Sequence, residues 1–237
     1  IYMDTNFKRS KQPKKKPKQE KQSVSKTSIL KKVLLYGALL ALIVLVIGAV
    51  LFAYYASKAP AFSDEKLKDP VPAEIYSNND ELVTTLFQGQ KREYVSIEDV
   101  PEQVSDAVLA IEDNRFYEHG AIDFIRLGGA VLSNITDGFA SQGASTITQQ
   151  VVKRAFLTEE QTLERKAQEA YLSYRLEQEY SKDDILEMYL NKIYYSDGIY
   201  GIRTASLYYF DKELADLNLA ESAYLAGLSN LPNVYNL

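Results

Sequence analysis

The chain has 237 residues, a net charge of −5 and no cysteine. The absence of cysteine excludes disulfide frameworks, thiol nucleophiles and cysteine-ligated metal sites, and a single histidine excludes a metal centre built from several imidazoles. The small net charge is the sum of two opposite parts, because residues 1–32 carry about +9 and the other 205 residues carry −14. This asymmetry is typical of a chain whose basic tail faces nucleic acid or a membrane.

A long uncharged run follows the basic tail. The 25 residues between Lys32 and Lys58 carry no charge and are mostly Leu, Ile, Val and Ala. About 20 apolar residues suffice to cross a bilayer as a helix, whereas the apolar part of a signal peptide has only about 7–15 residues. We therefore predict a transmembrane helix over residues 33–57. The alternative is a buried core helix, but such a helix rarely lacks a polar face over this length.

The distribution of basic residues predicts the orientation of that helix. Lysine and arginine crowd its N-terminal side, which places residues 1–32 in the cytoplasm and the acidic remainder outside the cell. We expect residues 1–32 to be a disordered tail, because they are rich in Lys, Gln, Ser and Pro. The cluster Lys14–Lys16 is also typical of a nucleic-acid-binding arm. We favour an orientation signal that contacts anionic lipid, and we expect no nucleic-acid partner.

The outer part begins with a predicted linker and a short β-hairpin over residues 58–100. Strand-like segments at residues 74–77 and 82–87 flank a turn at Asn78–Asp80. From Pro101 onward, apolar residues recur at helical spacing, which predicts a mainly α domain over residues 101–237. Helices are expected over residues 104–111, 122–139, 145–155, 162–179, 181–193, 205–210 and 217–228.

The first of these helices ends beside a carboxylate. Val104, Val108 and Ile111 lie on one apolar face, and Glu112 follows at the edge of that face. The negative end of the helix dipole and partial burial both disfavour a charged carboxylate, which suits a general base or acid. The alternative is a solvated helix end that pairs with Arg115.

The helix expected over residues 145–155 carries a polar stripe. Ser145 is its expected N-cap, and Gln149 and Lys153 follow on the same face at i+4 and i+8. Exposed backbone N–H groups at a helix N-terminus, together with a lysine, can hold a phosphate. The alternative is an ordinary amphipathic surface helix.

The helix expected over residues 162–179 is apolar on two sides, which predicts burial between two layers. One side carries Leu163 and Tyr174, and the other carries Leu172. Arg165 lies one turn before Glu169 and would keep that carboxylate ionised, although a purely structural ion pair has the same pattern. Two carboxylates in contrasting environments are typical of acid/base chemistry at glycosidic bonds.

Five segments, in this order, resemble the motifs of glycosyltransferase family 51, the peptidoglycan glycosyltransferase domain of class A penicillin-binding proteins. The resemblance covers about residues 71–237. The segments are Glu112–His119, Gly143–Lys153, Arg165–Glu169, Ile185–Asn191 with Gly198, Gly201, Ala205 and Tyr209–Phe210, and Ala223–Leu228 with Pro232.

The resemblance implies a lysozyme-like helical domain, half sunk in the outer leaflet, that polymerises lipid II into β-1,4-linked glycan with inversion and releases undecaprenyl pyrophosphate. It implies that Glu112 is the general base and Glu169 the second carboxylate. The implied substrate-binding residues are Ser145, Gln149, Gln150, Lys153 and Arg165. The implied structural motif residues are Phe116, His119, which organises the loop after the base, and Asn191. The implied partners are lipid II, the growing glycan chain, the membrane and other cell-wall synthesis proteins.

The resemblance also implies a divalent cation such as Mg²⁺, bound mainly through substrate pyrophosphate and few protein ligands, with Glu112 or Glu169 as candidates. The sequence departs from the family pattern at several positions. Gly129 stands where many members carry arginine, and we expect Arg126, one turn away, to substitute in substrate binding. Ala144, Ser196 and Asp211 stand where glycine is common.

In the family, the region corresponding to residues 122–139 dips into the bilayer, whereas an ordinary amphipathic helix is the alternative. The family domain continues past residue 237, so residues 101–237 are expected to be C-terminally incomplete. Two rival functions remain open. One is a lysozyme-like glycan-cleaving enzyme, and the other is a membrane-anchored scaffold with a decayed site.

Overall fold

The structure is a computed structural model that describes residues 26–68, 73–86, 91–136 and 145–229. The predicted tail therefore lies mostly outside the described residues, as do Phe87, Phe139, Gly143, Ala144 and Pro232. The chain divides into two compact units, Ile1–Ala49 and Val50–Leu237.

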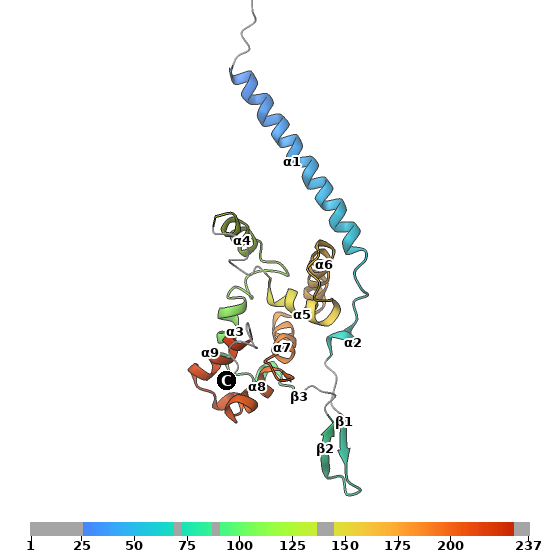
Figure 1. Cartoon of the computed structure of the whole chain (residues 1–237), viewed down its shortest axis with the longest axis vertical. Coiled ribbons are helices and arrows are strands. Elements are labelled where there is room, and N and C mark those ends of the chain that lie inside the picture. Colours follow the sequence, from blue (N-terminus) through green and yellow to red (C-terminus); the bar gives the residue numbers. More distant parts are fainter. Residues whose placement is uncertain (1–25, 69–72, 87–90, 137–144, 230–237) are drawn as a thin grey trace, which may run out of the picture. The chain divides into compact units, whose positions relative to one another are not determined.

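The N-terminal helix α1 spans Lys26–Ala56 (Figure 1). Its stretch Ile29–Ala56 has 28 residues with a mean hydropathy of 2.9, and none of its most apolar window is buried. The helix is therefore long and apolar enough to cross a membrane, and it begins seven residues before the expected span. The absence of buried side chains in this window argues against the core-helix alternative.

A short hairpin precedes the helical domain, as expected. After the single-turn helix α2 (Asp64–Leu67), strand β1 (Ala73–Tyr76) pairs antiparallel with strand β2 (Leu82–Leu86). Asp80 adopts a φ of 59° in the connecting turn, a left-handed conformation that aspartate tolerates better than most residues.

The rest of the described chain is mainly α-helical, which confirms the expected fold class. The longer helices are α3 (Glu102–Glu112), α4 (Phe124–Thr136), α5 (Ile147–Phe156), α6 (Leu163–Glu179), α7 (Lys182–Lys192), α8 (Ile202–Phe210) and α9 (Leu219–Leu228). Two 3₁₀ turns lie at Ile97–Asp99 and Leu214–Asp216.

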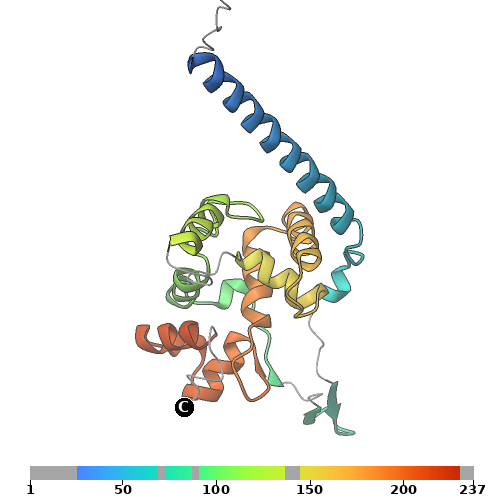
Figure 2. The same cartoon turned by 45° about the horizontal axis from the view of Figure 1, so that its top comes forward.

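Helix α5 is central to the packing. It contacts α6 and α7, while α3 packs against α9 (Figure 1, Figure 2). In each of these helices, apolar residues recur every three to four positions and so form one apolar face. These faces meet in one core. Fully buried members of this core include Val104, Val108, Ile147, Val151, Leu172, Leu176, Ile185, Leu190 and Leu225.

Two short strands that we did not predict tie the start of the domain to its C-terminal half. Strand β3 (Lys91–Arg92) pairs in parallel with strand β4 (Ile199–Tyr200). The Asn191 side chain reinforces this junction, since it accepts the N–H of Val95 and donates to the carbonyl of Val95. Gly201 follows with a φ of 83°, and a Cβ at that position would lie 3.2 Å from the backbone oxygen of Asn191. Glycine is therefore required there.

The prediction that α6 is buried on two sides is wrong. Leu172 and Leu176 are fully buried, but Leu163 is 82% exposed and Tyr174 is 58% exposed. Helix α6 packs against α5 and α7 through one stripe. The second apolar stripe faces away from that contact, so periodicity alone overestimated its burial.

Two departures from the family pattern occupy positions where the backbone favours glycine. Ser196 has a φ of 91°, and Asp211, the C-cap of α8, has φ 52° and ψ 40°. A side chain at such angles brings Cβ close to a backbone oxygen, which glycine avoids. The common glycines at these sites thus have a backbone explanation.

Candidate active site

Glu112 is the last residue of α3, and its carboxylate is buried, with 7% of the residue exposed. Two uncharged groups bind it. The Gln150 amide donates to Oε2 at 2.7 Å. The Ser229 hydroxyl shares its one proton between the Ala226 carbonyl at 2.7 Å and Oε1 of Glu112 at 3.3 Å. The alternative of a solvated end paired with Arg115 is wrong, because Arg115 pairs with Glu118 instead, at 3.1 Å.

The charge of Glu112 influences one phenolic side chain, Tyr189. Burial raises the pKa of Tyr189 above its ordinary value, the Glu112 charge adds to this rise, and the Arg154 charge opposes it. The Arg154 guanidinium lies 5.2 Å from the centre of the Tyr189 ring. The Tyr189 hydroxyl therefore stays protonated under the opposing charges of Glu112 and Arg154.

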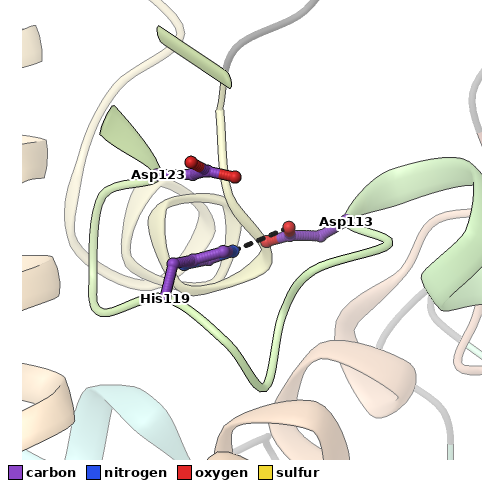
Figure 3. A group of neighbouring side chains, drawn as sticks. All are labelled: Asp113, His119 and Asp123. Carbon is purple, nitrogen blue, oxygen red and sulfur yellow. Dashed lines mark hydrogen bonds and ion pairs between the residues drawn. The ribbon is translucent and has the colours of Figure 1, made fainter. Parts of the chain in front are cut away.

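The loop after Glu112 is organised around Asp113 (Figure 3). One carboxylate oxygen of Asp113 lies 2.8 Å from Nε2 of His119, and the other accepts the backbone N–H of Ile147 at 3.1 Å. The second ring nitrogen of His119 contacts the carbonyl of Gly120. This network joins the end of α3 to the start of α5, and it places His119 in the loop-organising position that we expected.

Asp113, His119 and Asp123 bring their ligand atoms within 4.8 Å of one another, which is close enough to share a metal ion (Figure 3). Arg126 lies 3.8 Å from Asp113, and Arg115 lies 3.6 Å from Asp123. Two guanidinium groups this close oppose the binding of a cation.

The carboxylate of Asp123 is also committed to the N-terminus of α4. It accepts the backbone N–H groups of Ile125 and Arg126. Burial favours its neutral form, but the Arg126 N–H and the Arg115 charge prevail and hold the pKa of Asp123 below its ordinary value. The group is therefore a helix cap with ion pairs, and it does not fit a metal.

Arg126 lies beside the predicted base. Its guanidinium donates to the backbone carbonyl of Glu112. Arg126 thus supports the backbone of the α3 end and is absent from the residues that line the cavity described below. The expectation that it replaces the missing arginine at Gly129 by contacting substrate stays a prediction.

The other two motif residues have packing positions. Phe116 is 1% exposed, and the ammonium of Lys182 lies 4.4 Å from the centre of its ring. Asn191 is fully buried and binds backbone groups of Val95 and Glu187. Both residues hold the surroundings of the site and contact no open space.

The start of α5 differs from the prediction. Thr146 is the N-cap instead of Ser145, and it forms a capping box with Gln149. The N–H groups of Gln149 and Ile147 are bound by Thr146 and Asp113. These two amides are therefore not available for a phosphate. The Ser145 hydroxyl instead accepts from the Lys166 ammonium at 2.9 Å.

A cavity of about 490 Å³ collects most of the predicted substrate-binding residues. We call it the catalytic cavity. Its lining consists of Ser145, Gln149, Gln150, Lys153, Glu159, Gln161, Thr162, Leu163, Arg165, Lys166 and Glu169. Gln150 connects this cavity to Glu112, since it lines the cavity and donates to the carboxylate.

Glu169 is held by cations, in contrast to Glu112. It is 2% exposed, and it pairs with Arg165 at 2.8 Å and with the Lys166 ammonium. The predicted pairing of Arg165 with Glu169 across one helical turn is thus confirmed. Lys153 pairs with Glu159 at 3.2 Å across the same cavity. Neither Glu112 nor Glu169 belongs to the one group of candidate metal ligands found among the described residues.

Sequence reasoning missed two contacts of the site. Ser229 reaches Glu112 from a position 117 residues later in the chain, and no local pattern marks it. Asp113 directly follows Glu112 but was given no role, although a buried aspartate next to a helix end is a frequent backbone partner.

The sequence profile of the family described as transglycosylase matches residues 79–237. Penicillin-binding protein 1A/1B of Bacillus subtilis (strain 168) is 44% identical over 232 residues, which cover 98% of this chain and 25% of that protein. Penicillin-binding protein 1A of Streptococcus oralis is 44% identical over 195 residues, which cover 81% of this chain and 30% of that protein.

The chain thus spans between a quarter and a third of the length of these relatives. Among solved structures, penicillin-binding protein 1A from Haemophilus influenzae matches 68% of this chain and 14% of its own, with 25% identity and a TM-score of 0.33.

Proposed function

The chain belongs to the transglycosylase family, and on this premise we propose that it is a membrane-anchored peptidoglycan glycosyltransferase. The substrate would be lipid II, which it would polymerise into β-1,4-linked glycan strands. The anomeric carbon would invert, and undecaprenyl pyrophosphate would leave.

One observation carries this proposal. A buried carboxylate bound by two uncharged donors, Glu112, connects through Gln150 to a cavity lined by Lys153, Arg165 and Lys166. A carboxylate with neutral partners can take up a proton, and a group of cations can hold a diphosphate. This pairing suits sugar transfer from a diphosphate to a hydroxyl group.

The proposed reaction needs one proton acceptor and one charge clamp. Glu112 takes the proton from the 4-hydroxyl of the incoming lipid II as its oxygen attacks the anomeric carbon of the growing chain. The new C–O bond forms as the bond to pyrophosphate breaks on the opposite face, so the carbon inverts. Lys153 and Arg165 stabilise the charge that develops on the leaving pyrophosphate. Ser145, Gln149 and Gln150 orient the diphosphate and the adjoining sugar.

We assign Glu169 a positioning role in this proposal. Its carboxylate fixes the side chains of Arg165 and Lys166 on the cavity wall, and it lines the same wall. A clamp whose cations are held in advance loses less conformational entropy when it binds the diphosphate.

Any divalent cation such as Mg²⁺ would take its ligands mainly from the substrate pyrophosphate. Glu169 is already bound by two cations, and the Asp113–His119–Asp123 group does not fit a metal. Pyrophosphate oxygens are suitable ligands for Mg²⁺, which keeps several waters in most protein sites. No step of the proposed reaction is assigned to it.

Two features support the membrane location. The apolar stretch Ile29–Ala56 can cross a bilayer, and the positive-inside rule puts the catalytic domain outside the cell. Helix α4 also exposes large apolar side chains, since Phe124 is 75% exposed and Ile125 is 71% exposed. Exposed apolar groups at a helix start suit contact with the outer leaflet, close to the lipid tails of both substrates. Other cell-wall synthesis proteins are expected partners.

The test is incubation of the purified full chain, in neutral detergent, with lipid II as the only substrate. Appearance of long glycan on a gel supports the proposal. A parallel incubation contains preformed glycan in place of lipid II. Cleavage of that glycan, without polymerisation of lipid II, would instead establish the lysozyme-like alternative. The hydrolase is disfavoured in advance because attack by water on a glycan needs no diphosphate clamp. Inactivity toward both substrates would leave the scaffold as the function.

A further inference from the structure

A second cavity, of about 520 Å³, lies at the C-terminal end of α5, and we call it the basic cavity. Its volume is within the range of about 300–1,000 Å³ that small-molecule sites occupy. Its lining consists of Lys66, Lys68, Arg92, Lys153, Arg154, Ala155, Leu157, Glu159, Lys192, Tyr194 and Tyr200. It shares only Lys153 and Glu159 with the catalytic cavity.

The charge of this lining is unusual for the chain. Residues 33–237 contain 16 Lys and Arg against 30 Asp and Glu, yet the basic cavity gathers six of those cations and one carboxylate. The carboxylate, Glu159, is already paired with Lys153. Among the residues that the structure describes, Lys66, Lys68 and Arg154 have no carboxylate at ion-pair distance. Like charges gathered in this way repel one another unless an anion joins them.

Helix dipoles explain only part of the clustering. Lys153 and Arg154 lie in the last turn of α5, and Lys192 lies in the last turn of α7, where cations are favourable. Lys66 lies in the four-residue helix α2 and Arg92 lies in strand β3, so neither cation stands at the end of a long helix. Four separate segments of chain therefore bring positive charge to one place.

A second observation also points to a missing acceptor. The Nη1 atom of Arg154 is buried and has no hydrogen-bond partner among the described residues. A buried guanidinium N–H without an acceptor costs free energy, and the Tyr189 hydroxyl, whose pKa the Arg154 charge lowers, is also buried without a partner in the described part of the chain. Around it, the Tyr194 and Tyr200 rings lie 5.0 Å apart, and the Arg92 guanidinium lies 5.1 Å from the Tyr200 ring. The wall is thus built from fixed aromatic groups and cations.

We propose that the basic cavity is a second anion site that binds a diphosphate group, separate from the catalytic cavity. The spread of cations over several segments matches a ligand with more than one phosphate, which accepts hydrogen bonds from several sides. The diphosphate would come either from a lipid-linked molecule or from a soluble one. The inference concerns binding only, and it does not depend on the proposed reaction.

The test is a calorimetric titration of the full chain in neutral detergent with inorganic pyrophosphate, without divalent cations and at low ionic strength. The wild type should show two sites. The double change Lys66→Gln with Lys68→Gln should weaken one site at least about ten-fold, since both side chains are exposed and only charge is lost. The control, Arg203→Gln with Lys212→Gln, removes the same charge elsewhere and should change neither site.

A second pair separates this inference from the proposed function. Arg165→Gln with Lys166→Gln alters only the catalytic cavity and should weaken the site in that cavity, but not the site in the basic cavity. A single site lost with Lys66 and Lys68 supports the inference even if the catalytic cavity binds nothing. A single site lost only with Arg165 and Lys166, or two sites that ignore Lys66 and Lys68, overturns it.

The source of the diphosphate is resolved by repeating the titration with undecaprenyl pyrophosphate in the same micelles. Tighter binding that still depends on Lys66 and Lys68 identifies a lipid-linked ligand. Binding of inorganic pyrophosphate alone identifies a soluble one. Both results support the site, and failure of both ligands at this cavity refutes it.

Discussion

Glu112 and Glu169 are buried carboxylates of the same domain, but their neighbours are of opposite kinds. Glu112 accepts from the amide of Gln150 and the hydroxyl of Ser229, both uncharged. Glu169 is held between Arg165 and Lys166. Glu169 is therefore tied to two cations, whereas neither of the hydrogen-bond donors to Glu112 is charged. The contrast separates a group suited to proton transfer from a group suited to holding cations.

The strongest test of this contrast is Glu112→Gln, which keeps the shape of the side chain and removes its basicity. The polymerisation rate should fall by about 10²–10⁴, the usual contribution of a general base. The melting temperature should stay close to that of the wild type, because neutral donors tolerate a neutral acceptor. Glu118→Gln, in the same loop but paired on the surface with Arg115, is the control and should keep its activity.

The reverse pattern is expected for Glu169→Gln. Without the Glu169 carboxylate, the Arg165 side chain, which is only 15% exposed, has lost its charged partner. This loss should lower the unfolding free energy by about 1–3 kcal/mol. The cost is below that of a fully buried pair because Lys166 is 45% exposed. The Michaelis constant for lipid II should rise more than the turnover number falls. Chemical denaturation and steady-state kinetics measure the two effects.

The pair Arg175 and Glu179, on the same helix and with the same spacing, is the control for that experiment. Both side chains are well exposed, so Glu179→Gln should leave the unfolding curve unchanged. A stable Glu169→Gln protein with a wild-type Michaelis constant would contradict the positioning role.

A smaller effect is expected from the neutral donor itself. Gln150→Ala removes the 2.7 Å hydrogen bond to Glu112 and one wall of the catalytic cavity. The polymerisation rate should fall about five-fold, equivalent to the roughly 1 kcal/mol that such a bond contributes. Gln168→Ala, on the neighbouring helix and outside the cavity, serves as the control. Equal rates for the two variants would show that Gln150 does not support the base.

The smallest effect is a change in stability that should leave both carboxylates untouched. Asp211→Gly relieves the left-handed C-cap of α8 and should raise the unfolding free energy by about 0.5 kcal/mol. Asp211→Ala should lower it by about 1 kcal/mol, because alanine resists positive φ. Both variants should polymerise lipid II at the wild-type rate, so a thermal melt with an activity assay checks them.

The predicted helices illustrate what local pattern supplies. Three correct predictions are the apolar spacing of Val104 and Val108, the helix expected over residues 181–193 and the Arg165–Glu169 pair. Each depends on residues that lie only a few positions apart in the chain. Such features depend on helix geometry alone, and all three hold in the structure. The predicted N-cap of α5 was one residue off, because Ser145 and Thr146 are both good caps and only the capping box with Gln149 distinguishes them.

The environment of Glu112 illustrates what local pattern does not supply. Its donors lie 38 and 117 residues away, and Asp113 binds the start of α5 across 34 residues. The β3–β4 pairing and the basic cavity likewise join segments distant in sequence. Nothing in the spacing of residues marks such contacts.

The sequence by itself determined the apolar helix, the hairpin, the helical class and the residues of the five motifs, because each rests on periodicity, composition or short-range capping. Tertiary structure alone decided that Glu112 is buried among neutral donors, that two amides of the α5 start are occupied, and that cations gather in a second cavity. Burial and charge at a site depend on which segments meet there. That outcome is set by the packing of the whole core.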